Sequence, residues 1–325
     1  MKGCGTVLLC FAAAVSAHAH AQDKGTNSYP NRPVRFIVPF APGGGTDIVA
    51  RVMAQKLSGS VGQTVIVDNR GGAGGAIGSE LGVRAAPDGY TLTMAATSYA
   101  ANAALLTLPY DPISDIAKIS LMAYGPFLVV VNPGLRINSI KQLIGVDKAK
   151  PGTLNYGTAG PGSITHLGTE LFNILAGTRL VHVPYKGTGP ALTDIIGGQL
   201  QLMLASAPSA LPHLQSNRLR AIAVTSLKRS QSVPDLPTVA ESGVPDYEVL
   251  VWYAVYGPRG LPKTIVNLWN TAISKAIESP DFKSRLAAEA IEPVGGPPEA
   301  FGDLLQRDIA RWKTVVKQAA IKSNS

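Results

Sequence analysis

Short apolar runs typical of buried strands alternate with segments of helical periodicity, and this alternation is the feature that most constrains the fold. Residues 34–39 and 64–67 are strand-like, whereas the apolar residues after Asp47 recur at helical spacing. The same order returns between Leu128 and Thr225. Strands that alternate with helices usually pair in parallel, so the sequence predicts doubly wound α/β structure.

Turns rich in glycine and proline separate the expected elements. The expected strands span residues 34–39, 64–67, 90–94, 128–131, 154–157, 180–184, 201–205 and 219–225. The expected helices follow Asp47 and the glycine-rich segment 71–78, and then span residues 140–148, 163–176, 191–197, 264–278, 280–290 and 298–319.

The length of the chain predicts two units of packing. It has 325 residues, of which 46% are hydrophobic and 15% charged, which excludes a disordered chain. We expect residues 22–124 and 226–325 to form lobe 1 and residues 125–225 to form lobe 2, with crossings near Gly125 and Ser226. A ligand is then expected at the carboxyl ends of the strands, in the cleft between the lobes.

Residues 1–21 have the pattern of a cleaved signal peptide. Lys2 precedes an apolar run over residues 7–15, and Ala19-His20-Ala21 is a small-x-small cleavage site. The run is too short to span a bilayer, so the exported chain is not expected to be inserted in the membrane. Both cysteines lie in this segment, so no disulfide or thiolate metal site is expected in the mature chain.

The formal net charge is +8, but the basic residues are scattered. No basic stripe with interleaved aromatic residues occurs, so nucleic acid is not expected as a partner. The excess of positive charge would mildly favour anionic solutes through long-range attraction.

The first candidate site is the glycine-rich turn of residues 40–47, between a strand and a helix. A helix N-terminus presents unpaired N–H groups, and glycines let a ligand approach the backbone. This turn is therefore a candidate anion site. The structural alternative is a tight turn with Thr46 or Asp47 as helix N-cap, and both interpretations can hold together.

A second such turn spans residues 157–166. Ser163 is a good N-cap for the helix that follows, and several hydroxyl groups gather there. His166 stands in the first turn of that helix, with Glu170 four residues later, and local hydrogen bonding is its expected role. Two helix N-termini that face each other across a cleft, one from each lobe, would suit one small anion.

The third glycine-rich turn, residues 72–78, departs from the dinucleotide fingerprint because Ile77 stands at the third glycine position. Close packing of a helix on a strand is the better interpretation. No G-x-S-x-G motif occurs, and His166, His182 and His213 are too far apart in sequence for a paired metal motif. The sequence therefore favours a protein that is not an enzyme and has no cofactor or metal.

Several long motifs, in the same order, resemble the Bug (TctC-like) family of periplasmic solute receptors of tripartite tricarboxylate transporters. The resemblance covers essentially the whole mature chain. The motifs that carry it span residues 29–47, 68–75, 86–92, 157–170, 183–191, 197–199, 223–226 and 237–243.

This resemblance implies a type 2 periplasmic binding protein fold, with two doubly wound lobes, a hinged cleft and two crossover strands. It also implies that backbone groups, hydroxyls and ordered waters hold a ligand carboxylate. The residues of this chain that the resemblance assigns to the ligand are Phe40, Ala41, Gly44, Gly45, Thr46, Asp47, Ser98, Thr158, Gly160, Ser163, Ile164, Thr165, His166, Ala205 and Ser206.

The chain departs from the family pattern in lobe 2. Gln201 stands where the family often has Asp, and residues 205–207 replace a stretch that often holds Asp or Asn. No Arg in these loops could clamp a carboxylate through two parallel hydrogen bonds. A small mono- or dicarboxylate, aliphatic or aromatic, is therefore expected, with Asp47 as the only candidate partner for an ammonium group.

The expected role is a monomeric receptor that delivers its ligand to membrane transporter subunits. Two alternatives remain open at this point. The closed receptor could instead engage a periplasmic sensor domain, or the chain could be a nucleotide-dependent enzyme that uses residues 72–78.

Overall fold

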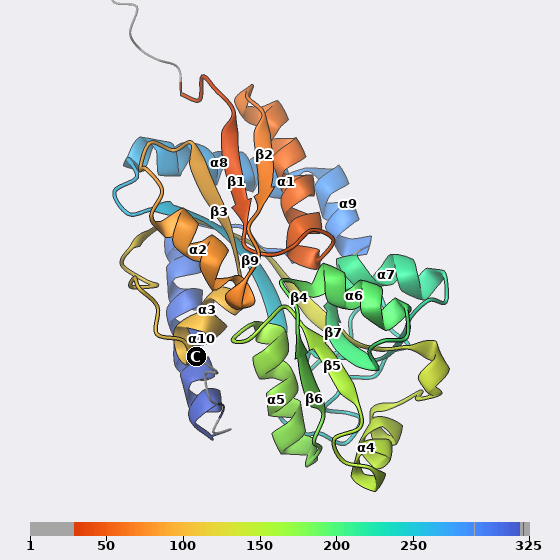
Figure 1. Cartoon of the computed structure of the whole chain (residues 1–325). Helices are drawn as coiled ribbons and strands as arrows, with labels where there is room; N and C mark the ends of the chain where they lie inside the picture. The colour runs from red at the N-terminus through yellow and green to blue at the C-terminus, as the bar shows by residue number, and fades with distance from the viewer. Residues whose placement is uncertain (1–28, 289, 319–320, 322–325) are drawn as a thin grey trace, which may run out of the picture.

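The computed structural model describes residues 29–288, 290–318 and 321, and the predicted signal peptide lies outside these residues. The described chain forms two α/β lobes that share one sheet (Figure 1). The strand order is β2-β1-β3-β9-β4-β7-β5-β6, and β8 and β10 also pair with β4. We call the part around β1, β2 and β3 lobe 1, and the part around β5, β6, β7 and β8 lobe 2.

The bounds of the elements follow chain order. The first part of lobe 1 contains β1 Val34–Val38, α1 Gly45–Val61, β2 Val65–Asn69, the 3₁₀ turn η1 Ala73–Gly75, α2 Ala76–Val83, β3 Thr91–Ala96 and α3 Thr97–Leu105. The chain then forms β4 Ile116–Val131, η2 Pro133–Leu135, α4 Ile140–Ala149, β5 Asn155–Thr158, α5 Ile164–Ala176, β6 Val181–Pro184, α6 Thr188–Ile196, β7 Leu202–Ser206, α7 Ala207–Gln215 and β8 Arg220–Val224. It returns through β9 Leu250–Pro258 and ends with α8 Lys263–Glu278, α9 Pro280–Ala288, β10 Glu292–Pro293 and α10 Pro298–Gln318.

Parallel pairing is confirmed inside each lobe. β1 pairs in parallel with β2 and β3, and β5 pairs in parallel with β6 and β7. The two crossover strands β4 and β9 depart from this pattern, because they are antiparallel to each other and to their other main neighbours. The reason is that β4 leaves lobe 1 for lobe 2 whereas β9 returns in the opposite direction.

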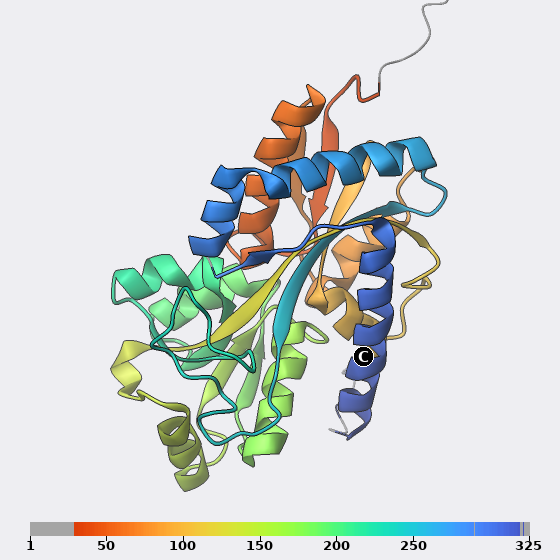
Figure 2. The same cartoon turned by 180° about the vertical axis from the view of Figure 1, so that it is seen from behind.

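These two long strands connect the lobes, and Figure 2 shows them side by side along the middle of the molecule. The first part of β4, up to Pro126, pairs with β9, and the rest pairs with β7 and β8. After β8 the chain stays beside lobe 2, since Tyr247 Oη donates to the carbonyl of Gly168 and Val249 N donates to that of Thr225. The lobe limits at residues 125 and 226 stay a prediction.

The three C-terminal helices occur as the sequence predicted. Helix α8 crosses the back of the lobe 1 sheet, and α10 packs on β4 and α3 (Figure 2). Trp269 and Ile273 of α8 and Phe301 and Leu305 of α10 are each fully buried. Their spacing of four residues places each pair on one helix face, which is the pattern of an amphipathic helix on a sheet.

Local signals explain where the best-predicted elements begin and end. Phe36 and Ile37 are both completely buried, so β1 is covered on both faces, as a central parallel strand should be. Helix α5 begins after its N-cap Ser163, whose Oγ accepts a hydrogen bond from His166 N, and ends at Gly177 in the left-handed conformation. The predicted start of this helix is therefore confirmed.

The glycine-rich turn at residues 72–78 packs α2 against β1, as the structural interpretation predicted. A Cβ atom on Gly78 would lie 2.4 Å from the carbonyl oxygen of Arg70 and 2.6 Å from Cα of Pro39. Only glycine permits this approach of helix and strand.

Candidate functional site

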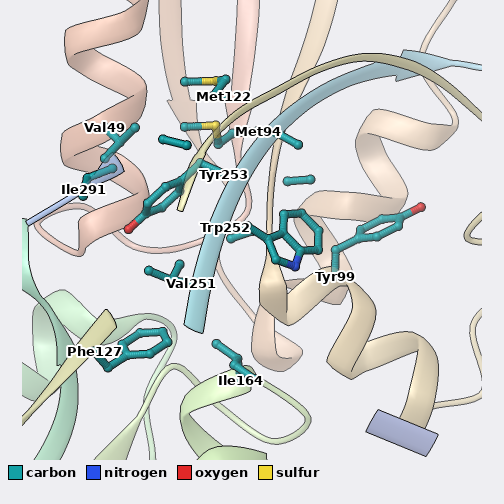
Figure 3. Packing of buried hydrophobic residues seen from close by; sticks show 14 of the residues in the cluster. Val49, Met94, Tyr99, Met122, Phe127, Ile164, Val251, Trp252, Tyr253 and Ile291 are labelled. Atoms are coloured by element: carbon teal, nitrogen blue, oxygen red, sulfur yellow. The ribbon is translucent and has the colours of Figure 1, made fainter. Parts of the chain in front are cut away.

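A small cavity of about 30 Å³ lies where the two lobes meet. Figure 3 shows Phe127 of β4, Ile164 of α5, and Val251 and Tyr253 of β9 around this region. The full lining consists of Phe40, Gly44, Gly45, Thr46, Ala96, Ser98, Phe127, Ala159, Ile164, Thr165, Thr188, Ser206, Val251 and Tyr253.

Five helices present their N-termini to this cavity, each through its N-cap or a residue of its first turn. Two of them, α1 and α3, come from lobe 1, and three, α5, α6 and α7, come from lobe 2. The contributing residues are Gly44, Gly45 and Thr46 of α1, Ala96 and Ser98 of α3, Ile164 and Thr165 of α5, Thr188 of α6, and Ser206 of α7.

The first turn of a helix leaves N–H groups without an acceptor inside the helix. In α1 the first amide that bonds back is that of Ile48, which donates to the carbonyl of Gly44. In α5 the amide of Ile164 donates to Ser98 Oγ at 3.1 Å. The amides of Gly45, Thr46 and Thr165 have no protein acceptor among the described residues.

Every side chain in the lining is uncharged. Apolar groups, among them those of Phe40, Phe127 and Val251, cover part of the wall. Hydroxyl groups supply the polar part, from Thr46, Ser98, Thr165, Thr188, Ser206 and Tyr253. Such a cavity can hold an anion only through neutral donors, which are backbone amides, hydroxyls and water.

Asp47 is buried but does not line the cavity. Its carboxylate accepts hydrogen bonds from Arg51, from Asn69 Nδ2 and from the backbone N–H of Gly43. Burial by itself would raise the pKa of Asp47, but these hydrogen bonds hold it below its ordinary value. The carboxylate is thus occupied within lobe 1, and the expectation of an ammonium partner loses its basis.

The expected N-cap at Thr46 or Asp47 is wrong, because α1 begins earlier. Its N-cap is Gly44, which has extended backbone and no capping side chain. Asp47 stands in the first turn and reaches back to the amide of Gly43 at 3.0 Å. The helix therefore keeps its first N–H groups uncapped by side chains, and the residues that carry them, Gly45 and Thr46, line the cavity.

Several predicted residues of the second turn do not line the cavity but make hydrogen bonds and ring contacts within lobe 2. Thr158 Oγ1 accepts from Gly160 N at 3.1 Å and lies 2.6 Å from His182 Nε2. Ser163 is fully buried and caps α5, and the ring of His166 stacks on that of His182 at 4.2 Å between centroids. Local hydrogen bonding by His166 occurs as expected, since its Nδ1 accepts from Gly162 N.

The predicted residues divide into two groups. Ala41, Asp47, Thr158, Gly160, Ser163, His166 and Ala205 are not part of the lining. The cavity brings together Phe40, Gly44, Gly45, Thr46, Ser98, Ile164, Thr165 and Ser206. Their contact with a ligand stays a prediction.

Sequence reasoning missed five lining residues that lie outside the candidate turns: Ala96, Phe127, Thr188, Val251 and Tyr253. Ala159 also lines the cavity and lies in the predicted turn of residues 157–166, although it was not assigned to the ligand. Thr188 was missed because the helix was expected to begin at residue 191, whereas α6 begins at Thr188 itself. The run of residues 250–256 is apolar and aromatic, which is typical of a buried strand, and that signal could have placed Val251 and Tyr253.

Two further findings concern the described part of the chain alone. Its His, Cys, Asp and Glu residues form no group of three or more that could hold a metal ion. Across residues 29–288, 290–318 and 321, no helix is both long enough and apolar enough to cross a membrane.

Two α/β lobes, joined by crossing strands and enclosing a small cavity between them, have the architecture of a solute-binding protein. The family model described as "Tripartite tricarboxylate transporter family receptor" matches residues 49–321, and the chain belongs to this family. Members of the family are substrate-binding proteins and not enzymes, which decides against the nucleotide-dependent alternative.

Individual relatives agree with this assignment. Protein BugT of Bordetella pertussis is 38% identical over 299 residues, which cover 91% of this chain and 92% of BugT. The structure of Rpa4515 from R. palustris with adipate is 37% identical, with a TM-score of 0.87 over 90% of this chain and 99% of that one. MatC from Rhodopseudomonas palustris with bound malate is 32% identical, with a TM-score of 0.85 over 89% of this chain and all of that one (100%).

Proposed function

We propose that the protein is an exported receptor that binds one small organic carboxylate in the cavity between its lobes and delivers it to membrane transporter subunits. The observation that carries this proposal is the meeting of five helix N-termini at a cavity whose side chains are all uncharged. Backbone amides, hydroxyls and ordered waters then bind the carboxylate.

The charge of the ligand follows from electrostatics. Each helix N-terminus acts as about half a positive charge, so five of them can offset one or two negative charges. The side chains of the lining offer no negative charge to hold an ammonium group. An acid without an amino group is therefore favoured over an amino acid or a cation.

At about 30 Å³ the cavity holds little more than water, so the lobes must move apart to admit an organic acid. The residues that line it favour a small molecule with an apolar body. Aromatic and aliphatic groups of Phe40, Phe127 and Val251 can cover a short carbon chain or ring. Two relatives with solved structures hold adipate and malate, which are both dicarboxylates. We expect a mono- or dicarboxylate of similar size, bound with an affinity of about −8 kcal/mol, which corresponds to micromolar.

A thermal-shift screen of the mature chain against small carboxylates tests this proposal. The best acid should raise the melting temperature, because about 2.7 kcal/mol of stabilisation is expected at a concentration of one hundred times Kd. The neutral amide of the same acid is the matched control and should bind at least a hundredfold more weakly by calorimetry. Equal affinity for acid and amide would contradict the proposed role of the helix N-termini.

Export and delivery have their own tests. The mature protein should begin at Gln22 by intact-mass measurement and be a monomer by light scattering. Vesicles that contain the transporter subunits should take up the acid only when the receptor is added. Uptake at the same rate without the receptor would contradict delivery.

A further inference from the structure

The lobes touch directly at a second place, beside the cavity. We call this contact the seam and define it as Ala41–Gly43 and Gly71 of lobe 1 against Lys186, Gly187 and Gly189 of lobe 2. None of these residues lines the cavity. The backbone N–H of Ala41 donates to the carbonyl oxygen of Lys186 at 2.9 Å.

Backbone meets backbone along the seam. A Cβ atom on Gly189 would lie 2.1 Å from the carbonyl oxygen of Pro42, and one on Gly187 would lie 2.8 Å from the amide nitrogen of Ala41. On the other side, a Cβ on Gly71 would lie 2.4 Å from the carbonyl oxygen of Lys186. All three distances are shorter than a real Cβ contact, so no side chain or water can lie between the lobes here.

We propose that the seam is a latch that stabilises the closed arrangement of the lobes independently of the solute. Its contacts join chain atoms of the two lobes, so they form on closure whether or not the cavity is filled. Most molecules of the free protein are then closed, about nine in ten or more. The latch thereby sets the apparent solute affinity, since that affinity scales with the fraction of molecules able to bind.

One glycine of the seam, Gly189, allows the contact between the lobes to be tested at a position where the backbone conformation does not itself require glycine. Gly187 has a φ of 154°, which favours glycine whatever lies opposite. Gly189 lies in the first turn of α6 without a positive φ, and the three atoms that a Cβ there would meet all belong to lobe 1. The close approach of Gly189 is therefore a requirement of closure alone.

The test compares Gly189→Ala with Gly197→Ala at the other end of α6. A Cβ on Gly197 would meet its nearest atom at 3.4 Å, within its own helix. Because Cys4 and Cys10 lie in the predicted signal peptide, cysteines introduced at the exposed Ser60 and Lys150 can carry a fluorophore pair without removing others. The free Gly197→Ala protein should retain the closed population of the wild type, and Gly189→Ala should lose at least nine-tenths of it.

A second measurement does not depend on the variant. In the free wild-type protein the amide of Ala41 should exchange its hydrogen at least tenfold more slowly than an exposed loop amide, because Lys186 O accepts from it. Since Pro190 follows Gly189, the melting temperature of the alanine variant is measured alongside. Unprotected exchange at Ala41, or identical fluorescence distributions for both variants, would overturn the latch.

This inference rests on the proposed function only for its effect on affinity. In an affinity measurement, Gly189→Ala should weaken binding of the acid found in the thermal-shift screen at least tenfold, and Gly197→Ala should weaken it less than twofold. If no carboxylate binds, the proposed function fails, while the fluorescence and exchange results still decide on the latch. Equal affinity of the two variants for the acid would overturn the latch as the determinant of affinity.

Discussion

Thr225 is the residue that joins the two crossings of the chain. It is fully buried where β8 ends, and its Oγ1 accepts from Phe127 N at 2.8 Å and donates to the carbonyl oxygen of Val249 at 2.5 Å. One hydroxyl thus ties together the strand that enters lobe 2 and the segment that leaves it.

Replacing Thr225 by Val should lower the free energy of unfolding by about 1–3 kcal/mol, because it leaves a buried N–H and a buried carbonyl without this partner. Urea unfolding measures the change. Thr225→Ser keeps the hydroxyl and should cost less than half as much. An equal loss in both variants would show that packing of the methyl group matters and the hydrogen bonds do not.

His166 and His182 predict how stability depends on pH. Burial lowers the pKa of His182 to about 4, with a further contribution from His166 beside it. Burial also lowers the pKa of His166, which the nearby Glu170 partly opposes. Tyr156, whose hydroxyl donates to Glu170 at 2.5 Å, completes the group, with its ring stacked on His182.

Both folded pKa values lie below the unfolded value of about 6.5, so the unfolded chain binds more protons in this range. The stabilising contribution of neutral histidine is complete above pH 6.5 and decreases as the pH falls toward 4. Chemical denaturation at pH 7.5, 6, 5 and 4 should show this decline, and His182→Gln should make it shallower. A pH profile identical to the wild type in that variant would exclude His182 as a source of the decline.

At the scale of the element, α5 was predictable in full and β9 was not. A capping serine, a helical apolar period and a terminal glycine all indicate the same helix between Ser163 and Gly177. The segment before β9 carries turn residues and no glycine-rich motif. The apolar run of residues 250–256, which lies in β9 itself, does not reveal that this strand crosses between the lobes. Pairing with β3 and β4, which lie far away in sequence, decides its place.

The same limit applies to the candidate site. Both glycine-rich turns were identified because their local sequence signals a helix N-terminus, and residues of both turns line the cavity. Thr188 was missed because the start of α6 was placed three residues too late, and Tyr253 because the run of residues 250–256 was not recognised as a strand. Asp47 shows the converse, since its position in the motif did not reveal that Arg51 and Asn69 occupy its carboxylate.

Ser163→Ala tests α5 as an element. The loss of this N-cap should lower the free energy of unfolding by about 1 kcal/mol, within the usual range of 0.5–2 kcal/mol. Because Ser163 is not part of the lining, the affinity for the acid should change much less than in variants that alter the cavity. Unfolding curves of the variant and the wild type measure the change. An unchanged stability in Ser163→Ala would mean that the cap contributes nothing.

At the scale of the whole molecule, closure brings Ser98 of lobe 1 against the start of α5 in lobe 2. Ser98 Oγ accepts from the amide of Ile164 at 3.1 Å, and both groups are buried. Opening the lobes would return this amide to water, so the hydrogen bond contributes only to the closed form.

Ser98→Ala should therefore weaken binding of the acid about tenfold, equivalent to about 1.4 kcal/mol. Calorimetry measures the affinity. Ser114→Ala, at an exposed position that is not part of the lining, is the control and should bind like the wild type. Retained affinity in Ser98→Ala would show that this contact between the lobes does not contribute to binding.

The central claim is that main-chain N–H groups at helix N-termini bind the carboxylate. A crystal structure of the complex with the tightest acid from the screen tests it most directly. We predict a carboxylate oxygen within about 2.7–3.2 Å of the amide nitrogen of Gly45, Thr46 or Thr165, or joined to one of them by a single water. An acid bound outside the cavity, or held by a charged side chain, would contradict the claim.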